Sequence, residues 1–245
     1  MPQCKERGEM LGNYIKVGGF SSRSIGLFCK QLPMFSPAIE SKDVFTVGGR
    51  LTNLYKPAHH YNDITVEIEA VLLGLNINSV YSFFTNGDGR ELWFSHIPDR
   101  YAIIRQLVAI DHQRIGNGAL ELKITLKCDP FKYANDNQPL TFLTSPADFI
   151  VGGNFYAEPV IVAKGCSDGF AMSINGNEFT TSGLTGNIYI DVPRRVAYQT
   201  GTPRTVVDNY TTGNIWDLIL VPDEINGIEF SGATSIEITK NERWV

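Results

Sequence analysis

The chain has 245 residues and a net charge of −5, from 21 Lys and Arg against 26 Asp and Glu. Hydrophobic residues make up 43% and charged residues 19%, which is typical of a globular protein and excludes the composition of a disordered one. The excess of acidic residues disfavours a protein that grips a phosphate backbone, because such binding takes clustered Lys and Arg.

Neither a membrane span nor a secretory leader is expected. No run approaches the roughly 18 consecutive apolar residues that a spanning helix needs, and the first ten residues are polar and mixed in charge. Cys4, Cys29, Cys128 and Cys166 are far apart in the sequence, with no Cys-x-x-Cys pair. We therefore expect reduced, mostly buried thiols of a cytosolic product and no structural zinc site.

Two alternating runs in the first half predict half-buried strands of an antiparallel sheet. Apolar residues alternate with mostly acidic ones over residues 63–71, and over residues 119–127 they alternate with Glu121, Lys123, Thr125 and Lys127. A period of two places the polar side chains of each run on one face. Glu67 and Glu69 of the first strand are therefore expected to face lysines of the second, in pairs that stabilise by up to about 1 kcal/mol each.

A short amphipathic helix is predicted between these runs. Apolar residues spaced by three and four cover residues 76–85, and Asn76 or Asn78 can cap the helix. Residues 91–95 and 101–111 are rich in β-formers and predict further strands. One helix on an antiparallel sheet is an α+β arrangement rather than a doubly wound one.

The residue composition of the sequence changes after Pro130. Residues 131–159 are rich in Asn, Pro, Thr and Gly, and we place a domain boundary or a long connection there. Short strands separated by turn signals follow, and Asn175-Gly176 is the strongest hairpin signal among them. Strands are expected at residues 159–163, 170–174, 178–181, 187–192, 214–221, 227–230 and 235–239. Strands at this spacing predict a β-sandwich.

The motifs of common enzymes are missing from the sequence. It has no Gly-Lys-Ser or Gly-Lys-Thr phosphate loop, no Gly-x-Ser-x-Gly elbow and no His-Glu-x-x-His metal motif. Glu67 and Glu69, two apart on a strand, would lie roughly 6.5–7 Å apart, near the separation in inverting glycosidases. The lysines expected beside them favour a solvated, paired face instead. We expect no catalytic residues, no cofactor and no metal.

An ordered series of segments resembles the distal tail proteins of long, non-contractile-tailed phages. The matching segments are residues 14–22, 32–33, 47–50, 54–57, 91–95, 97–101 and 122–133. They span residues 12–133, and the C-terminal part fits loosely through shorter motifs. The family often continues its Gly-Arg element with Asp-Gly, whereas Leu51-Thr52-Asn53 follows Arg50 here.

The resemblance implies a structural protein of the virion rather than an enzyme. Members of the family form a six-fold ring at the distal end of the tail, and DNA passes through the ring without specific binding. The ring joins the tail tube protein to a tail-tip or tail-associated lysin protein, and in some phages it carries receptor-binding proteins. The implied location is the tail tip or baseplate, with assembly in the host cytoplasm and no membrane partner.

The resemblance also implies a mainly β fold of two domains. Residues 1–135 are expected to form a ring-building antiparallel β-sandwich or barrel with one helix, and residues 136–245 a galectin-like β-sandwich. The last strand is expected to stay in this sandwich or to return to the first domain. The candidate residues for the ring lumen or the subunit contacts are Arg50, Lys56, His59, Glu67 and Glu69.

The competing interpretation is a carbohydrate-binding, lectin-like module for host-cell attachment. Trp216 is the candidate stacking platform, with Asn214 and Asp217 as polar contacts. Against it, Trp93 and Trp216 are both expected in the core. Galectin-type sugar signatures are absent, so a galectin-like fold would not by itself imply sugar binding. The third interpretation, a glycoside hydrolase, depends on Glu67 and Glu69.

Overall fold

The structure, a computed structural model, describes residues 13–46, 52, 54–86, 89–116, 118–199, 205–207 and 210–245. The chain divides into two compact units, residues 1–135 together with Val245 and residues 136–244. Each unit has its own hydrophobic core. Within the described ranges, strands dominate and none of the helices is long and apolar enough to cross a membrane. The prediction of a mainly β chain is confirmed.

The first unit is built on one antiparallel sheet with the strand order β2-β1-β7-β8-β9-β6-β3. The strands are β1 (Ile15–Val17), β2 (Phe20–Ser21), β3 (Leu27–Gln31), β6 (Ile64–Leu73), β7 (Glu91–Phe94), β8 (Ile97–Arg114) and β9 (Ala119–Ala134). The backbone N–H of Cys29 in β3 donates to the carbonyl of Asn13, just before β1, at 3.3 Å. This bond links β3, at one end of the strand order, to the segment that leads into β1 near the other end.

The predicted alternation is present in β6, where buried and exposed side chains follow each other through most of the strand. Strand β6 pairs with β9 along its full length, so that Ile68 lies opposite Ile124 and Glu69 opposite Lys123. The isoleucines point into the core and the charged side chains point away from it. The period of two in the sequence therefore specified which face of each strand is buried.

The single α-helix of the described part, α1 (Ile77–Thr85), covers the core of this sheet and buries Val80 and Phe84. Its bounds agree with the prediction from the apolar spacing. The capping chemistry differs, because the side chain of Asn76 makes no capping bond. Instead the carbonyl of Asn76 accepts a hydrogen bond of 2.7 Å from the Ser79 hydroxyl.

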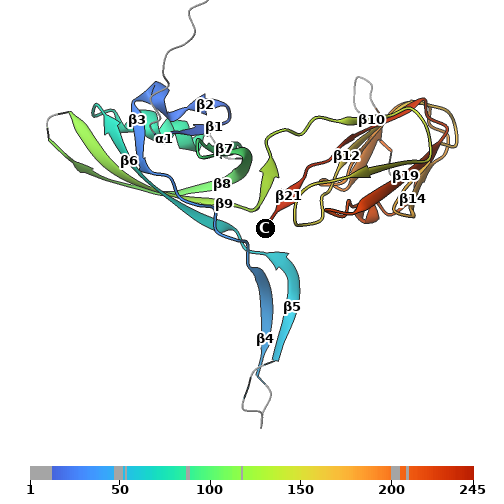
Figure 1. The fold of residues 1–245 in the computed structure, drawn as a ribbon, viewed down its shortest axis with the longest axis horizontal. Coiled ribbons are helices and arrows are strands. Elements are labelled where there is room, and N and C mark those ends of the chain that lie inside the picture. The colour runs from blue at the N-terminus through green and yellow to red at the C-terminus, as the bar shows by residue number, and fades with distance from the viewer. Residues whose placement is uncertain are drawn as a thin grey trace, which may run out of the picture. The chain divides into compact units, whose positions relative to one another are not determined.

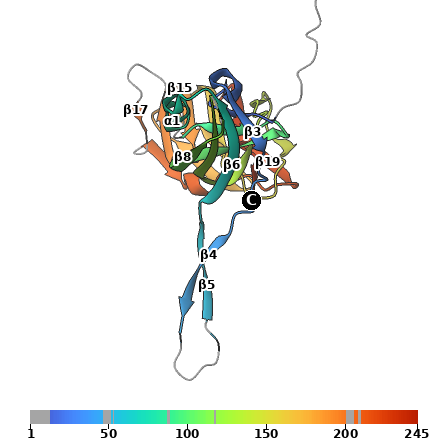
Figure 2. The same ribbon diagram turned by 90° about the vertical axis from the view of Figure 1, so that its left-hand side faces the viewer.

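A two-stranded hairpin, β4 (Glu40–Phe45) and β5 (Leu54–Tyr61), belongs to the first unit but pairs neither with β3, which precedes it in sequence, nor with β6, which follows it. It extends away from the sheet that precedes and follows it (Figure 1; Figure 2). The sequence pattern predicted neither strand β4 nor strand β5. An isolated hairpin has no sheet to complete and little core of its own, so its exposed surface is available for contacts outside the unit.

The second unit is a β-sandwich of two antiparallel sheets. One sheet has the order β10 (Leu140–Phe142), β20 (Ser235–Thr239), β12 (Val160–Cys166), β15 (Gly186–Asp191), β16 (Val196–Gln199) and β17 (Thr205–Val206). The other has the order β11 (Ala147–Ile150), β19 (Ile225–Ser231), β13 (Ala171–Ile174), β14 (Asn177–Thr181) and β18 (Thr211–Gly213). Apolar side chains from both sheets, among them Ile190 and Phe179, form one core.

The division between the two units, after residue 135, lies within residues 131–159, where a domain boundary or a long connection was expected. The same range also contains the end of β9 and strands β10 and β11. Strand β9 runs past Pro130 because its pairing with β8 is irregular there, between the pairs Ile104–Cys128 and Ala102–Lys132. A proline is tolerated at such a bulge, where no ladder hydrogen bond needs its missing N–H.

The expected strand over residues 214–221 is wrong, since the short 3-10 helix η3 (Ile215–Asp217) lies there. The side chain of Asn214 accepts a hydrogen bond of 3.3 Å from the backbone N–H of Trp216. This local cap turns the chain at the point where an extended strand would continue.

Two glycines of the second unit give a matched test of backbone geometry. Gly213 (φ +105°) packs so closely that an added Cβ would lie 2.2 Å from the carbonyl oxygen of Glu178, whereas a Cβ at Gly176 (φ +82°) would meet nothing within 4 Å. Gly176→Ala is expected to cost about 1 kcal/mol of conformational strain, and Gly213→Ala about 3 kcal/mol or more because backbone must also move. Urea unfolding measures both, and equal losses would contradict the close contact at Gly213.

Candidate functional site

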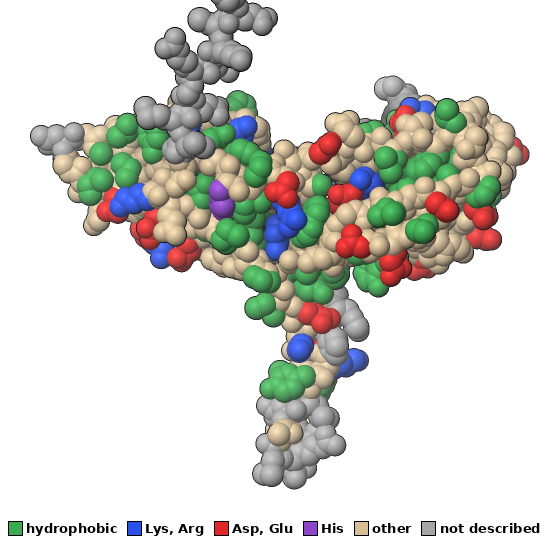
Figure 3. Space-filling view, in the orientation of Figure 1, with side chains coloured by type: hydrophobic (Ala, Val, Ile, Leu, Met, Phe, Trp, Pro, Cys, Tyr) green, Lys and Arg blue, Asp and Glu red, His purple; other side chains and the backbone are tan. Residues whose placement is uncertain are grey.

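The hairpin β4–β5 carries exposed apolar side chains on both of its faces. Val44, Phe45 and Tyr55 are 54%, 51% and 64% exposed. Val44 lies directly opposite Tyr55, and Phe45 points to the other face because successive residues of a strand alternate. We call these three residues the hairpin patch. Apolar and charged side chains are mixed along the hairpin (Figure 3). Apolar exposure on both faces is typical of a docking element rather than of a strand that belongs to its own core.

Three predicted contact residues fall on this hairpin or on its connection. Lys56 is exposed on β5 and lies opposite Asp43 of β4. His59 also belongs to β5, but its side chain lies outside the described residues, and so does the whole of Arg50, between the two strands in sequence. Their role in subunit contacts stays a prediction. Sequence analysis missed the hairpin patch. The available signal was the adjacent apolar pair Val44-Phe45, because adjacent residues of a strand face opposite sides and an apolar pair therefore predicts apolar side chains on both faces.

The outer face of the sheet in the first unit is charged, as predicted. The Nζ atom of Lys123 lies 3.0 Å from Oε2 of Glu67, and Glu69 lies directly opposite Lys123. The hydrogen bond from Lys123 to Glu67 raises the pKa of Lys123, and the charges of Glu67, Glu69 and Asp111 act in the same direction. About half of both paired side chains is exposed, so the pair adds little to stability.

A second set of polar contacts continues across the same unit. Glu121 pairs with Lys30 of β3 and accepts a hydrogen bond of 2.7 Å from Nε2 of Gln113. The hydrogen bond from Lys30 lowers the pKa of Glu121 most, and the hydrogen bond from Gln113 lowers it further. Glu67, Glu69, Lys123, Glu121 and Lys30 together are the outer charged face. Its carboxylates are solvated and share cationic partners, unlike the acid of a glycosidase, which needs apolar surroundings that keep it protonated.

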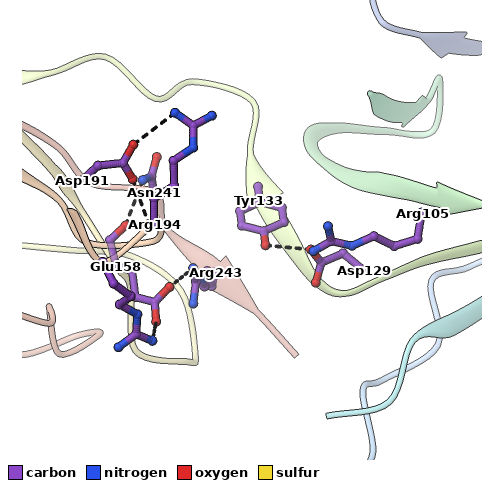
Figure 4. A network of polar contacts seen from close by, with 9 residues as sticks. Arg105, Asp129, Tyr133, Glu158, Asp191, Arg194, Asn241 and Arg243 are labelled. Carbon is purple, nitrogen blue, oxygen red and sulfur yellow. Dashed lines mark hydrogen bonds and ion pairs between the residues drawn. The ribbon is translucent and has the colours of Figure 1, made fainter. Parts of the chain in front are cut away.

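One carboxylate of the first unit is buried. Asp129 is 4% exposed, pairs with Arg105 and accepts a hydrogen bond of 3.3 Å from the Tyr133 hydroxyl (Figure 4). Since a buried charge is tolerated only when it is paired and hydrogen-bonded, these contacts account for Asp129 structurally. In the part of the chain that the structure describes, no group of three or more His, Cys, Asp or Glu side chains is placed to hold a metal ion.

The three described cysteines, Cys29, Cys128 and Cys166, are free and buried. Burial raises the pKa of Cys29 and Cys128 to about 12 and that of Cys166 to about 11. Because the thiolate is the reactive form, these thiols are poor nucleophiles at neutral pH. Their burial agrees with the prediction for these three positions.

In a Cys4→Ser variant, the remaining thiols are expected to resist maleimide at pH 8 in the folded state and to react fully in denaturant. The raised pKa values also stabilise the fold below the ordinary thiol value near 9, and this contribution is lost as the pH rises toward 12. Mass spectrometry counts the labels. Rapid labelling of the native variant at pH 8 would contradict the burial.

The two tryptophans expected in the core differ in their environment. Trp93 is half-buried, and its Nε1 donates to the carbonyl of Pro98 at 3.2 Å. Trp216, on η3, is instead 61% exposed, so its expected place in the core is wrong. Its burial is prevented by the turn of η3, which buries Ile215 and points the next side chain outward.

The predicted polar neighbours of Trp216 contact each other. Asn214 Nδ2 donates to Oδ2 of Asp217 at 2.9 Å. Sequence analysis missed Arg195, whose guanidinium carbon lies 4.7 Å from the centroid of the Trp216 ring. No sequence signal joins these two residues, because they lie in different loops that only the folded sandwich brings together.

Comparison with known proteins gives a likeness of fold. No family model matches the sequence, and no curated protein matches it. Among solved structures, the chain is similar to the Dit (gp 19.1) protein of phage SPP1, with a TM-score of 0.68 and 14% sequence identity. The likeness covers 95% of this chain and 99% of that one. That protein is described as a paradigm of the hub adsorption apparatus in phages that infect Gram-positive bacteria. A shared fold of this extent confirms the fold expected from the resemblance.

Proposed function

We propose that this protein is a structural subunit of a phage tail tip that assembles into a six-membered ring. The observation that carries the proposal is the likeness to SPP1 Dit along 95% of the chain, which includes both units. The segments that resemble the distal tail family in sequence lie mostly in the first unit, and the fold likeness extends the agreement to the second.

The hairpin patch supports self-association. Removing Val44, Phe45 and Tyr55 from water is favourable, and each of these side chains is more than half exposed in the described chain. When one surface of a subunit docks on a different surface of the next, the contact repeats head to tail and closes into a ring if the rotation allows. In this proposal the hairpin of each copy, with Lys56, Arg50 and His59 on it or on its connection, contacts the neighbouring copy.

The outer charged face is suited to the wall of a DNA channel. Glu67 and Glu69 present carboxylates to solvent, and the lysines beside them are largely occupied by carboxylate partners. Such a surface has no cluster of unpaired cations to hold a phosphate backbone, so DNA can pass without being retained. We place Glu67 and Glu69 at the lumen on this ground.

The ring would join the tail tube protein on one side to a tail-tip or tail-associated lysin protein on the other, in the virion. The role is that of a non-enzymatic hub. Ion pairing of Glu67 and burial of the described thiols support this role, because neither leaves a group prepared for acid–base or nucleophilic catalysis.

The solution mass tests the proposal. Light scattering during size exclusion is expected to give six copies of the 27.2 kDa chain, and negative-stain images of the peak are expected to show closed rings. A monomer or dimer that persists at millimolar concentration would contradict assembly by the chain alone.

A further inference from the structure

Trp216 is the most exposed tryptophan of the described chain, and one face of its ring is covered by a cation. Its side chain is 61% exposed, and the guanidinium carbon of Arg195 lies 4.7 Å from the ring centroid. The indole is therefore fixed in orientation while much of it stays open to solvent. Both residues belong to the second unit, whereas the outer charged face belongs to the first.

Arg195 is held in place by a chain of ion pairs. Its Nη2 lies 3.0 Å from Oε1 of Glu158, whose Oε2 lies 2.6 Å from Nη2 of the buried Arg243. The carbonyl of Glu158 also accepts a hydrogen bond of 2.8 Å from Asn241 Nδ2 (Figure 4). Glu158 is anchored in this way, so the position of Arg195 over the indole is determined by the sandwich rather than by solvent.

The backbone of Arg195 adopts an unfavourable conformation. Its φ is +59°, in the left-handed region that is unfavourable for a non-glycine residue. Non-glycine residues held in such conformations cluster at ligand-binding and active sites, so this position is a candidate for a role in binding.

We propose that Trp216 and Arg195 form a binding platform for a saccharide. The apolar C–H face of a pyranose ring stacks on the open part of an aromatic side chain, and hydroxyl or carboxylate oxygens at its edge need hydrogen-bond donors. Arg195 uses Nη2 for Glu158, and its guanidinium has further N–H groups for such oxygens. Asn214 and Asp217, beside the indole, retain polar atoms for the sugar's hydroxyl groups.

The charge of the platform narrows the class of sugar. The guanidinium already lies against the ring, so a cationic ligand would be repelled, whereas a neutral or acidic sugar would not. This inference does not depend on the proposed ring, because no residue of the hairpin takes part in it. It agrees with the lectin-like interpretation at Trp216 and adds Arg195 as the residue that selects the ligand.

The test uses the full chain and oligosaccharides of glucose, N-acetylglucosamine or glucuronic acid, four to six units long, with tryptophan fluorescence and calorimetry as readouts. At least one series is expected to bind, and the neutral and acidic series distinguish whether Arg195 contacts hydroxyl or carboxylate groups. Trp216→Ala is expected to weaken binding at least tenfold and Trp216→Phe to retain part of it. Arg195→Gly, which relieves the strain and removes the guanidinium, is expected to weaken binding at least fivefold without loss of thermal stability.

The matched control is Tyr156→Ala, which removes another aromatic side chain of the same unit that is 49% exposed. It is expected to leave binding and ring assembly unchanged. The platform is refuted if no oligosaccharide binds at 10 mM, or if Trp216→Ala binds as tightly as the unmodified chain. Either result leaves the solution mass unaffected, so the failure of this inference is distinguishable from failure of the proposed ring.

Discussion

Replacing Val44, Phe45 and Tyr55 together by serine is expected to leave the chain monomeric at concentrations at which the unmodified chain forms rings. Each of these side chains is only about half exposed in the isolated chain, so burying the rest of one at an interface contributes about 1 kcal/mol. Losing all three contacts in every interface weakens association by about 3 kcal/mol, which is about a hundredfold in the dissociation constant. Light scattering over a dilution series measures the effect.

The control for the hairpin variant replaces three exposed apolar residues of the second unit, Leu143, Ile150 and Ile225, by serine. These are 74%, 63% and 70% exposed, so the change in surface composition is similar. The control is expected to form rings, and both variants are expected to remain folded, with the hairpin variant melting like the unmodified chain at a dilution that dissociates the rings. Rings of normal stability in the hairpin variant would show that the interface lies elsewhere.

Truncating one large buried side chain to alanine in either core is expected to destabilise the unit to which that core belongs. Phe84 in the first unit and Phe179 in the second are both 0% exposed and belong to separate clusters of buried residues. Replacing a buried phenylalanine by alanine costs about 3–5 kcal/mol, from lost transfer energy and the cavity left behind. Phe84→Ala is therefore expected to lower one thermal transition and Phe179→Ala another, as seen by calorimetry and hydrogen exchange.

An exposed phenylalanine provides the control for the core variants. Phe20 is 64% exposed in the first unit. Phe20→Ala is expected to change the free energy of unfolding of either unit by no more than a few tenths of a kcal/mol. If Phe84→Ala and Phe179→Ala both shift one common transition, the two units unfold together and the two cores are not independent.

Much of the fold could be predicted from local patterns. The alternation over residues 63–71 and 119–127 identified the buried faces of β6 and β9 and the pairing of acidic with basic side chains between them. The apolar spacing of α1 and the Asn175-Gly176 turn were equally informative. Both turn residues have positive φ, at 51° and 82°, and the turn joins β13 to β14 as predicted.

The errors occurred where a local signal competed with another or was lacking. Asn214 caps a turn within a segment of β-forming residues, and the cap prevailed over the propensity. Strand β4 shows no alternation because neither of its faces is buried, so a search for one-sided burial passed over it.

The sequence alone determined which side chains of β6, β9 and α1 are buried, because that information is carried by residues two, three or four positions apart. Only the tertiary structure decided which distant elements meet. The meeting of Arg195 with Trp216 depends on loops whose positions are set by the whole sandwich, as does the path from Glu158 to Arg243. Likewise, only the strand pairing of the folded unit shows that the hairpin β4–β5 lies outside the main sheet. Such contacts form only when long loops close. The geometry of these loops is determined by the packing of the whole unit, and no periodic pattern in the sequence encodes it.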